Sequence, residues 1–296
     1  MSRRLIVGLG EILWDLFGRE KHLGGATANF AYHANALGDR GVIVSRIGSD
    51  KLGDEIREAL AALRTPAEYI QTDRRLPTGT VRVRLDRAGQ PTFTIATGVA
   101  WDNLRLNDKL LGLVRRADAI CYGTLAQRCA VSRRTIRGCV AAATRALSVC
   151  DLNLRAGFLS LEPEDTGRME IVTESLRMAD VLKLNDDELA VLRSALGRPE
   201  RGDPLARWLI REFQLHAVCV TRGARGCVLR TARKRVAAPG IRVRVADTVG
   251  SGDAFTAAMV NRMLRRRPLE EVAAFANRVG AYVASRPGGT PPLDLR

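Results

Sequence analysis

The sequence predicts an α/β fold in which helices cover both faces of a central, mostly parallel sheet. Short apolar runs rich in Val, Ile and Leu alternate with segments of helical periodicity along most of the 296 residues. Because parallel strands are joined by helical crossovers and are buried on both faces, this alternation is typical of such a sheet. The expected strands are 5–8, 42–45, 119–122, 148–151, 181–184 and 217–220, and the expected helices are 26–37, 54–63, 134–147, 187–196, 254–264 and 269–284.

One segment departs from this alternation and predicts a β-hairpin. Residues 80–86 and 91–97 each show a period of two, and the turn between them contains Gly89. An antiparallel hairpin inserted among βαβ units has to pack away from the central sheet. We expect it either to cover a site or to decorate an edge.

A glycine-rich run at residues 247–255 joins a turn, a helix start and an acidic residue. Residues 241–245, ahead of it, alternate apolar and basic side chains like a half-buried strand. Gly250 and Gly252 permit a tight turn, so that N–H groups of the helix start converge where an anion can bind. Asp253 follows and can accept the proton of an attacking hydroxyl. The run indicates a phosphoryl-transfer site, although a Gly-Ser turn with Asp253 as a helix cap explains the same residues.

This run resembles the second signature of the PfkB (ribokinase-like) carbohydrate kinases, and residues 24–30 through 48–54 resemble the first. The likeness extends from about residue 10 to residue 289 and is greatest to bacterial fructokinases. It implies a ribokinase-like fold in one domain, 1–296, with a small β lid contributed by about 11–23 and 76–100. It also implies ATP-dependent transfer of a γ-phosphoryl group to a sugar hydroxyl, with fructose as the expected acceptor.

The resemblance implies a sugar site near the start of the first long helix. Asp15, Gly25 and Asn29 are expected to bind sugar hydroxyls, and Gly24 permits close backbone approach. Trp101, which follows the hairpin, is expected to form an aromatic wall against the sugar. Asp15 is equally well explained as a solvated loop acid.

The expected catalytic group consists of Gly250, Ser251, Gly252, Asp253 and Arg155. Arg155 follows a strand end, where α/β folds place ligand contacts. By resemblance its planar guanidinium reaches toward both substrates. In a chain so rich in arginine, the alternative is that Arg155 is one more surface residue.

Nucleotide and magnesium contacts are implied by a second strand end. In the run Lys183-Leu-Asn-Asp-Asp-Glu188, the resemblance implies that Lys183, Asn185 and Glu188 lie near the nucleotide, with Asn185 and Glu188 ordering Mg²⁺ largely through water. A helix cap at Asn185 with Glu188 in the first turn explains the same spacing.

The run 220–227 is similar to the nucleotide-binding turn of the family. Thr221, Gly223 and Gly226 are expected along the phosphates or ribose, and Asn277 is expected near the adenine. Taken alone, the glycine spacing fits any hairpin turn.

Asp247 and the backbone near Val249 resemble the loop that many relatives fill with K⁺. Such an ion would fix the geometry of the adjacent N–H groups. Asp247 is equally well explained as a turn residue.

Composition narrows the remaining possibilities. We expect a cytoplasmic protein that does not enter a membrane, with reduced thiols, since the six cysteines include no C-x-x-C pair. The net charge of +15 is spread along the chain with few aromatic residues, so specific nucleic-acid binding is not expected. A homodimer through the lid is expected. The alternatives are a ribokinase, a 2-keto-3-deoxygluconate kinase or a nucleoside kinase, and, outside enzymes, a sugar-sensing or nucleic-acid-associated protein.

Overall fold

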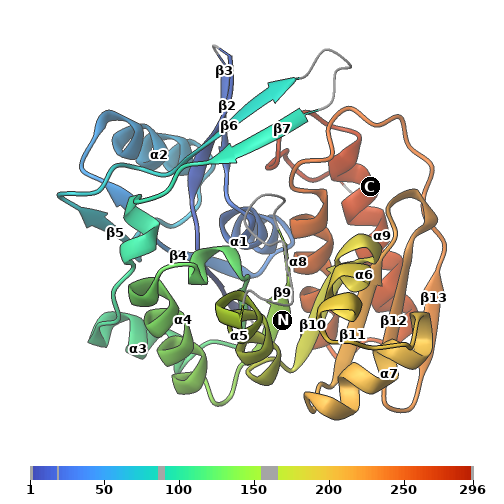
Figure 1. Ribbon diagram of the computed structural model, residues 1–296. Coiled ribbons are helices and arrows are strands. Elements are labelled where there is room, and N and C mark those ends of the chain that lie inside the picture. The colour runs from blue at the N-terminus through green and yellow to red at the C-terminus, as the bar shows by residue number, and fades with distance from the viewer. Residues whose placement is uncertain (1–2, 19, 86–90, 155–165, 295–296) are drawn as a thin grey trace.

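The computed structural model describes residues 3–18, 20–85, 91–154 and 166–294, which form two sheets (Figure 1). The larger sheet has nine strands in the order β13-β12-β11-β10-β9-β8-β1-β4-β5. In this spatial order, each strand from β11 across to β5 pairs in parallel with its neighbour. At the opposite edge, β12 and β13 pair antiparallel. Their bounds are β1 Leu5–Leu9, β4 Arg40–Gly48, β5 Ile70–Asp73, β8 Ala119–Tyr122, β9 Leu147–Asp151, β10 Val181–Asn185, β11 Ala217–Thr221, β12 Cys227–Thr231 and β13 Arg235–Ala238.

Helices cover both faces of this sheet, as predicted. Alternate side chains of one strand enter different cores: Val218 packs with the layer of α3 to α7, and Cys219 with that of α1, α8 and α9. None of the helices in the described ranges is long and apolar enough to span a membrane. The helices are α1 Ala26–Ala36, α2 Lys51–Ala62, α3 Asp108–Val114, α4 Ala130–Ala142, α5 Thr166–Arg177, α6 Asp186–Ala195, α7 Gly202–Glu212, α8 Ser251–Leu264 and α9 Leu269–Ala284, with short 3-10 turns at Ala100–Asn103, Leu125–Gln127 and Gly223–Arg225.

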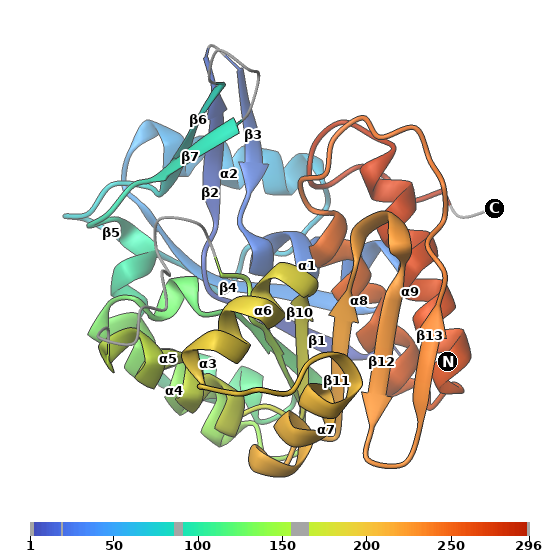
Figure 2. The same ribbon diagram turned by 45° about the vertical axis from the view of Figure 1, so that its right-hand side comes forward.

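The smaller sheet is the expected lid and stands above the large sheet (Figure 2). Its order is β3-β2-β6-β7, with β2 at Leu13–Phe17, β3 at Glu20–Gly24, β6 at Thr80–Leu85 and β7 at Pro91–Ile95. The predicted hairpin is confirmed, because β6 and β7 pair antiparallel, and β6 adds to β2 in parallel. The turn containing Gly89 lies outside the described residues.

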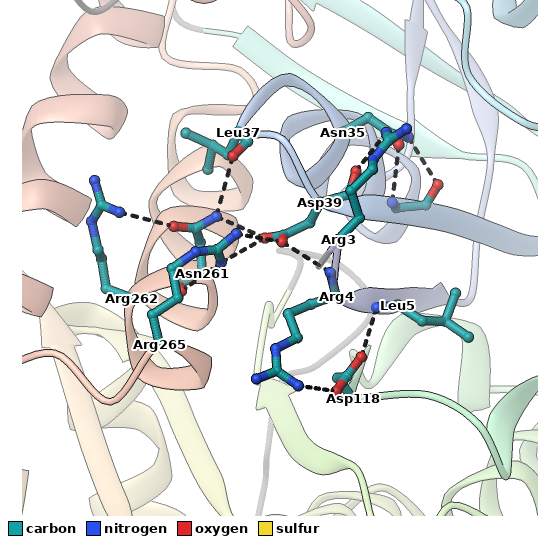
Figure 3. Close-up of polar contacts among 11 residues, drawn as sticks. Arg3, Arg4, Leu5, Asn35, Leu37, Asp39, Asp118, Asn261, Arg262 and Arg265 are labelled. Carbon is teal, nitrogen blue, oxygen red and sulfur yellow. Dashed lines mark hydrogen bonds and ion pairs between the residues drawn. The ribbon is translucent and has the colours of Figure 1, made fainter. Parts of the chain in front are cut away.

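The C-terminal end of α8 is fixed to the sheet by a buried carboxylate (Figure 3). Asp39, which precedes β4, is fully buried and accepts hydrogen bonds from both terminal nitrogens of Arg265, at 2.7 and 3.1 Å. Asn261 Nδ2 donates to the same carboxylate at 2.7 Å. Because a buried charge is stable only when it is paired, this contact fixes the position of α8.

Two expectations about secondary structure are wrong. Residues 241–245 form no strand: Ile241, Val243 and Val245 are 44%, 37% and 60% exposed, because β13 already ends at Ala238 and the chain turns away there. The helix expected over 134–147 is displaced to 130–142, and Leu147 instead opens β9 opposite Ala119. In both cases the local pattern is compatible with either state, and the strand positions available in the sheet decide the outcome.

Candidate active site

A cavity of about 710 Å³ lies between the lid and the carboxyl ends of the parallel strands. This is where open α/β sheets bind ligands. It brings together residues from the lid, the start of α1, the ends of β9 and β10 and the turn before α8. The described residues that line it are Glu11, Leu13, Asp15, Gly25, Ala26, Asn29, Val81, Ile95, Leu125, Asn153, Leu154, Lys183, Asn185, Glu188, Thr248, Val249, Gly250, Gly252 and Asp253.

The turn at the start of α8 is shaped by glycine. Gly250 is the N-cap, with φ 74°, and a Cβ there would lie 2.4 Å from the carbonyl oxygen of Gly289. A Cβ on Gly252 would lie 3.2 Å from Lys183 Nζ. Ser251 Oγ donates to the carbonyl oxygen of Thr248 at 2.9 Å, which closes the turn. The first N–H groups of α8, the positive end of its dipole, therefore meet the cavity without intervening side chains.

Asp253 is the buried carboxylate of this turn. It is 8% exposed, and Asn29 Nδ2 donates to its Oδ2 at 2.9 Å. The predicted base and a predicted sugar ligand, 224 positions apart in the sequence, are thus in direct contact. A hydroxyl held by the Asn29 amide would lie beside an acceptor for its proton.

A buried ion pair lies beneath the turn. Lys183 Nζ donates to Asp151 Oδ1 at 3.0 Å, and Thr256 Oγ1 of α8 donates to Asp151 Oδ2 at 2.9 Å. Burial acts to lower the pKa of Lys183, but the Asp151 and Glu188 carboxylates outweigh it and raise that pKa above its ordinary value. Asp151 belongs to none of the expected site residues, although its position at the end of β9 is the sequence signal that marks it.

Asn185 and Glu188 form a capping box at the start of α6. Each side chain accepts a hydrogen bond from the backbone N–H of the other residue, at 2.8 Å. The second Glu188 oxygen accepts from the N–H of Leu154 at 2.7 Å, and burial raises the pKa of Glu188. The helix-cap alternative is therefore correct as geometry, while both residues also face the cavity.

The expected sugar residues gather at the lid, with one exception. Gly25 has φ 107°, and a Cβ there would lie 2.4 Å from the carbonyl oxygen of Glu11; a Cβ on Gly24 would lie 2.2 Å from Asp15 Oδ2. Asp15 and Gly25 line the cavity. Trp101 does not line it: it is 1% exposed and packs in the core beneath the Arg128 guanidinium, 3.9 Å from its ring centroid. The expectation of an aromatic wall is wrong because the 3-10 turn at Ala100–Asn103 points Trp101 inward.

Of the expected nucleotide residues, Lys183, Asn185 and Glu188 line the cavity, whereas the second group does not: Thr221, Gly223, Gly226 and Asn277. A Cβ on Gly226 would lie 2.1 Å from the carbonyl oxygen of Ala238, and Asn277 Nδ2 donates to the carbonyls of Ala238 and Pro239 at 3.2 and 3.0 Å. Thr221 ends β11, and Gly223 opens the 3-10 turn that follows, with free space at its Cα. Asn277 and Gly226 thus fix the segment after β13, next to the exposed run 241–245.

Asp247 joins two loops. Its Oδ1 accepts from the N–H of Val249 at 2.9 Å, and its Oδ2 accepts from the N–H of Gly288 at 3.1 Å. Asp247 therefore holds the segment before α8 against the segment after α9. Arg155, the remaining catalytic expectation, lies outside the described residues.

One buried contact behind the turn had no sequence signal. His33 of α1 is fully buried, and its Nε2 lies 2.9 Å from the carbonyl oxygen of Gly289, the residue that abuts Gly250. Burial lowers the pKa of His33 to about 4. The histidine is therefore neutral, and its Nε2–H donates to the carbonyl.

Known proteins resemble this chain over nearly its full length. A sugar kinase of Pyrococcus horikoshii is 29% identical over 98% of this chain and 94% of its own, and Fructokinase-2 of Zea mays is 29% identical over 98% and 91%. The solved structure of the P. horikoshii sugar kinase in complex with ATP has a TM-score of 0.84 at 28% identity, covering 97% and 94% of the two chains.

A fructokinase double mutant from Vibrio cholerae, in a fructose, ADP and potassium bound form, shares the fold with a TM-score of 0.80 at 24% identity, covering 98% and 96%. The fold is therefore ribokinase-like, as predicted. Residues 10–296 match the family described as pfkB family carbohydrate kinase. Because this match spans nearly the whole chain, the chain belongs to the pfkB family of carbohydrate kinases.

Proposed function

We propose that this carbohydrate kinase transfers the γ-phosphoryl group of ATP to a hydroxyl of fructose. The observation that carries the proposal is the Asp253 carboxylate at the start of α8, hydrogen-bonded to Asn29 and lining the cavity under the lid. The acceptor oxygen attacks the γ-phosphorus, the bond to the β–γ bridging oxygen breaks, and ADP leaves. Asp253 takes the acceptor proton, and the N–H groups around Gly250 and Gly252 stabilise the charge on the transferred group.

Fructose is proposed as acceptor from two lines of support. Asp15, Gly25 and Asn29 place polar groups on the cavity wall below the lid, where a polyol can be hydrogen-bonded. The relatives include fructokinases, one of them from Zea mays and one solved with fructose from Vibrio cholerae. Arg155 is proposed to contact the transferred group.

ATP is proposed as donor, with its phosphates at the α8 turn. The P. horikoshii relative was solved with ATP. Lys183 adds a buried positive charge below the turn. We propose that four residues lie along the ribose and base: Thr221, Gly223, Gly226 and Asn277. The exposed side chains of Ile241, Val243 and Val245 offer an apolar surface for a planar ring there.

The residues present fit two metal ions. Glu188 is buried, and both of its carboxylate oxygens accept hydrogen bonds from backbone N–H groups. Together with Asn185 it would therefore hold Mg²⁺ through water molecules, and the ion would neutralise phosphate charge. Asp247 holds two loops together through N–H groups, and this leaves nearby backbone carbonyls, such as that of Val249, to bind K⁺. A potassium ion there would fix the turn that carries Gly250.

The acceptor is tested by measuring kcat/KM with D-fructose, D-ribose, 2-keto-3-deoxygluconate and adenosine at saturating Mg-ATP. The expected result is the highest value for fructose. The lid has to exclude water, so a poorly fitting sugar should give slow transfer or ATP hydrolysis. A higher value for any of the other three would identify that compound as the acceptor in place of fructose. If ATP is not consumed with any of the four, the proposed sugar-kinase mechanism is refuted.

We propose that residues 1–296 form one kinase domain. We also propose that the protein is cytoplasmic, with support from its six free thiols. We further propose a homodimer through the lid, since β3 lies at the edge of the lid sheet in the described part of the chain, where its outer backbone groups can pair with a second copy. Light scattering of the purified protein tests the dimer, and a monomer mass at micromolar concentration would refute it.

A further inference from the structure

A second cavity, of about 360 Å³, lies on the face of the large sheet that α3 to α7 cover. It is enclosed by α6 and α7 over β11 and β12, and its floor is apolar, with Leu205, Val218 and Val228. Their strand neighbours Cys219 and Cys227 point to the opposite face, into the layer of α8 and α9. The turn before α8 and the floor of this cavity therefore lie on opposite faces of the sheet, and only the rim residues Asp186 and Arg222 adjoin Asn185 and Thr221 at the strand ends.

The rim of this cavity is strongly basic. Five arginines line it against two carboxylates, Asp186 and Asp203. Asp203 is shared by two of them, with Oδ1 at 3.4 Å from Arg230 Nε and 3.6 Å from Arg235 Nε. Asp186 pairs with Arg225, which is not a lining residue. Within the described part of the chain, the other three lining arginines have no carboxylate partner; they are Arg193, Arg201 and Arg222.

One of these guanidinium groups also holds a buried donor without an acceptor. The Nε atom of Arg222 is shielded from solvent and has no hydrogen-bond partner among the described residues, whereas its Nη2 donates to the carbonyl oxygen of Arg225 at 3.3 Å. A buried N–H without an acceptor is costly, and the cost is removed when an acceptor enters. An anion that enters the cavity would supply one.

We propose that this cavity binds an organic phosphate with an apolar, planar body, distinct from the substrates of the catalytic site. The apolar floor suits the ring, and the unpaired arginines suit the planar, multidentate recognition of a phosphate. The volume is within the range of small-molecule sites. The five guanidinium groups and two carboxylates leave a formal excess of three positive charges, and a phosphate dianion would neutralise two of them.

The probe for this site is phenyl phosphate, titrated calorimetrically into the enzyme saturated with Mg²⁺ and a non-hydrolysable ATP analogue, so that the position of the transferred phosphoryl group is already filled. We expect saturable binding, at least about tenfold tighter than that of phenol or of inorganic phosphate alone. No saturable heat up to about 10 mM, or equal affinity for phenol, would overturn the proposal.

Matched double variants locate the binding. Arg193→Ala with Arg201→Ala removes two rim charges and should weaken binding about tenfold or more. Arg207→Ala with Arg211→Ala removes the same charge from exposed positions of α7 outside the cavity and should leave it unchanged. Ala190→Trp, at an exposed position of the rim, should block entry without disturbing the core. Equal losses in the two double variants, or undiminished binding in Ala190→Trp, would refute this location.

Discussion

His33 should make the stability of this protein depend on pH between about 6.5 and 4. The residue is fully buried in α1, and burial lowers its pKa from 6.5 to about 4, although the hydrogen bond to Gly289 acts in the opposite direction. In the folded protein it therefore stays neutral over a range in which the unfolded chain becomes protonated. Because the unfolded state binds more protons there, the free energy of unfolding rises with pH.

The sign and the size follow from the two pKa values. The contribution is fully present above about pH 6.5 and is lost as the pH falls toward about 4. A shift of about 2.5 pH units corresponds to about 3 kcal/mol in total, and about 2 kcal/mol of it is lost between pH 7 and pH 5. Asp50 and Asp73 also have lowered pKa values, from 3.8, so they titrate below this window.

The assay is urea denaturation of wild type and His33→Gln at pH 7, 6 and 5. Glutamine keeps an N–H that can reach the Gly289 carbonyl but does not titrate. Glu188, whose pKa is raised by burial, acts in the opposite direction within the same window, and comparison with the variant cancels it. We expect the stability advantage of wild type to shrink by about 2 kcal/mol between pH 7 and pH 5. A difference that stays constant within about 0.5 kcal/mol would show that His33 does not carry the effect.

Three further predictions concern transfer itself. Asp253→Asn should lower kcat by about 10²- to 10⁴-fold, because the amide keeps the contact with Asn29 but cannot accept the hydroxyl proton. The affinity for ATP, measured by calorimetry, should be nearly unchanged, and turnover at the wild-type rate would contradict the assignment of Asp253 as the base. Arg155→Lys should lose about tenfold or more in kcat, whereas the exposed Arg267→Lys should not, and equal rates would make Arg155 a surface residue. Replacing Na⁺ by K⁺ at constant ionic strength should raise activity, since screening treats both ions alike; identical rates would leave Asp247 as a loop anchor.

The fold could be predicted because its strands carry unusually plain signals. Residues 119–122 and 217–220 are apolar runs that have to be buried on both faces, and the structure places them in β8 and β11. Residues 241–245 show the apolar and basic alternation of a half-buried strand, yet they lie exposed. Alternation states only that a segment can pair. Whether a neighbouring strand remains free to pair with it is decided by the rest of the chain.

The site could be predicted in part for a similar reason. Gly250, Gly252 and Asp253 are adjacent in the sequence, so their local geometry follows from residue type. The contact of Asn29 with Asp253 depends on the whole fold, and only the family resemblance put the two in one site. Trp101 shows the limit of reasoning from residue type, because an aromatic side chain near a lid suits a sugar wall and a core equally well.

Two buried carboxylates hold α8, and with it the glycine turn that we propose as catalytic, in place. Near its start, Thr256 donates to Asp151, a buried carboxylate at the carboxyl end of β9 that also binds Lys183. At its other end, Arg265 and Asn261 bind the buried Asp39. Removing either carboxylate would leave buried donors or a buried cation unpaired, so both ends of the helix resist displacement. N–H groups held in this way need little reorganisation when charge develops on a transferred phosphoryl group, and this is the condition under which backbone dipoles stabilise a transition state most strongly.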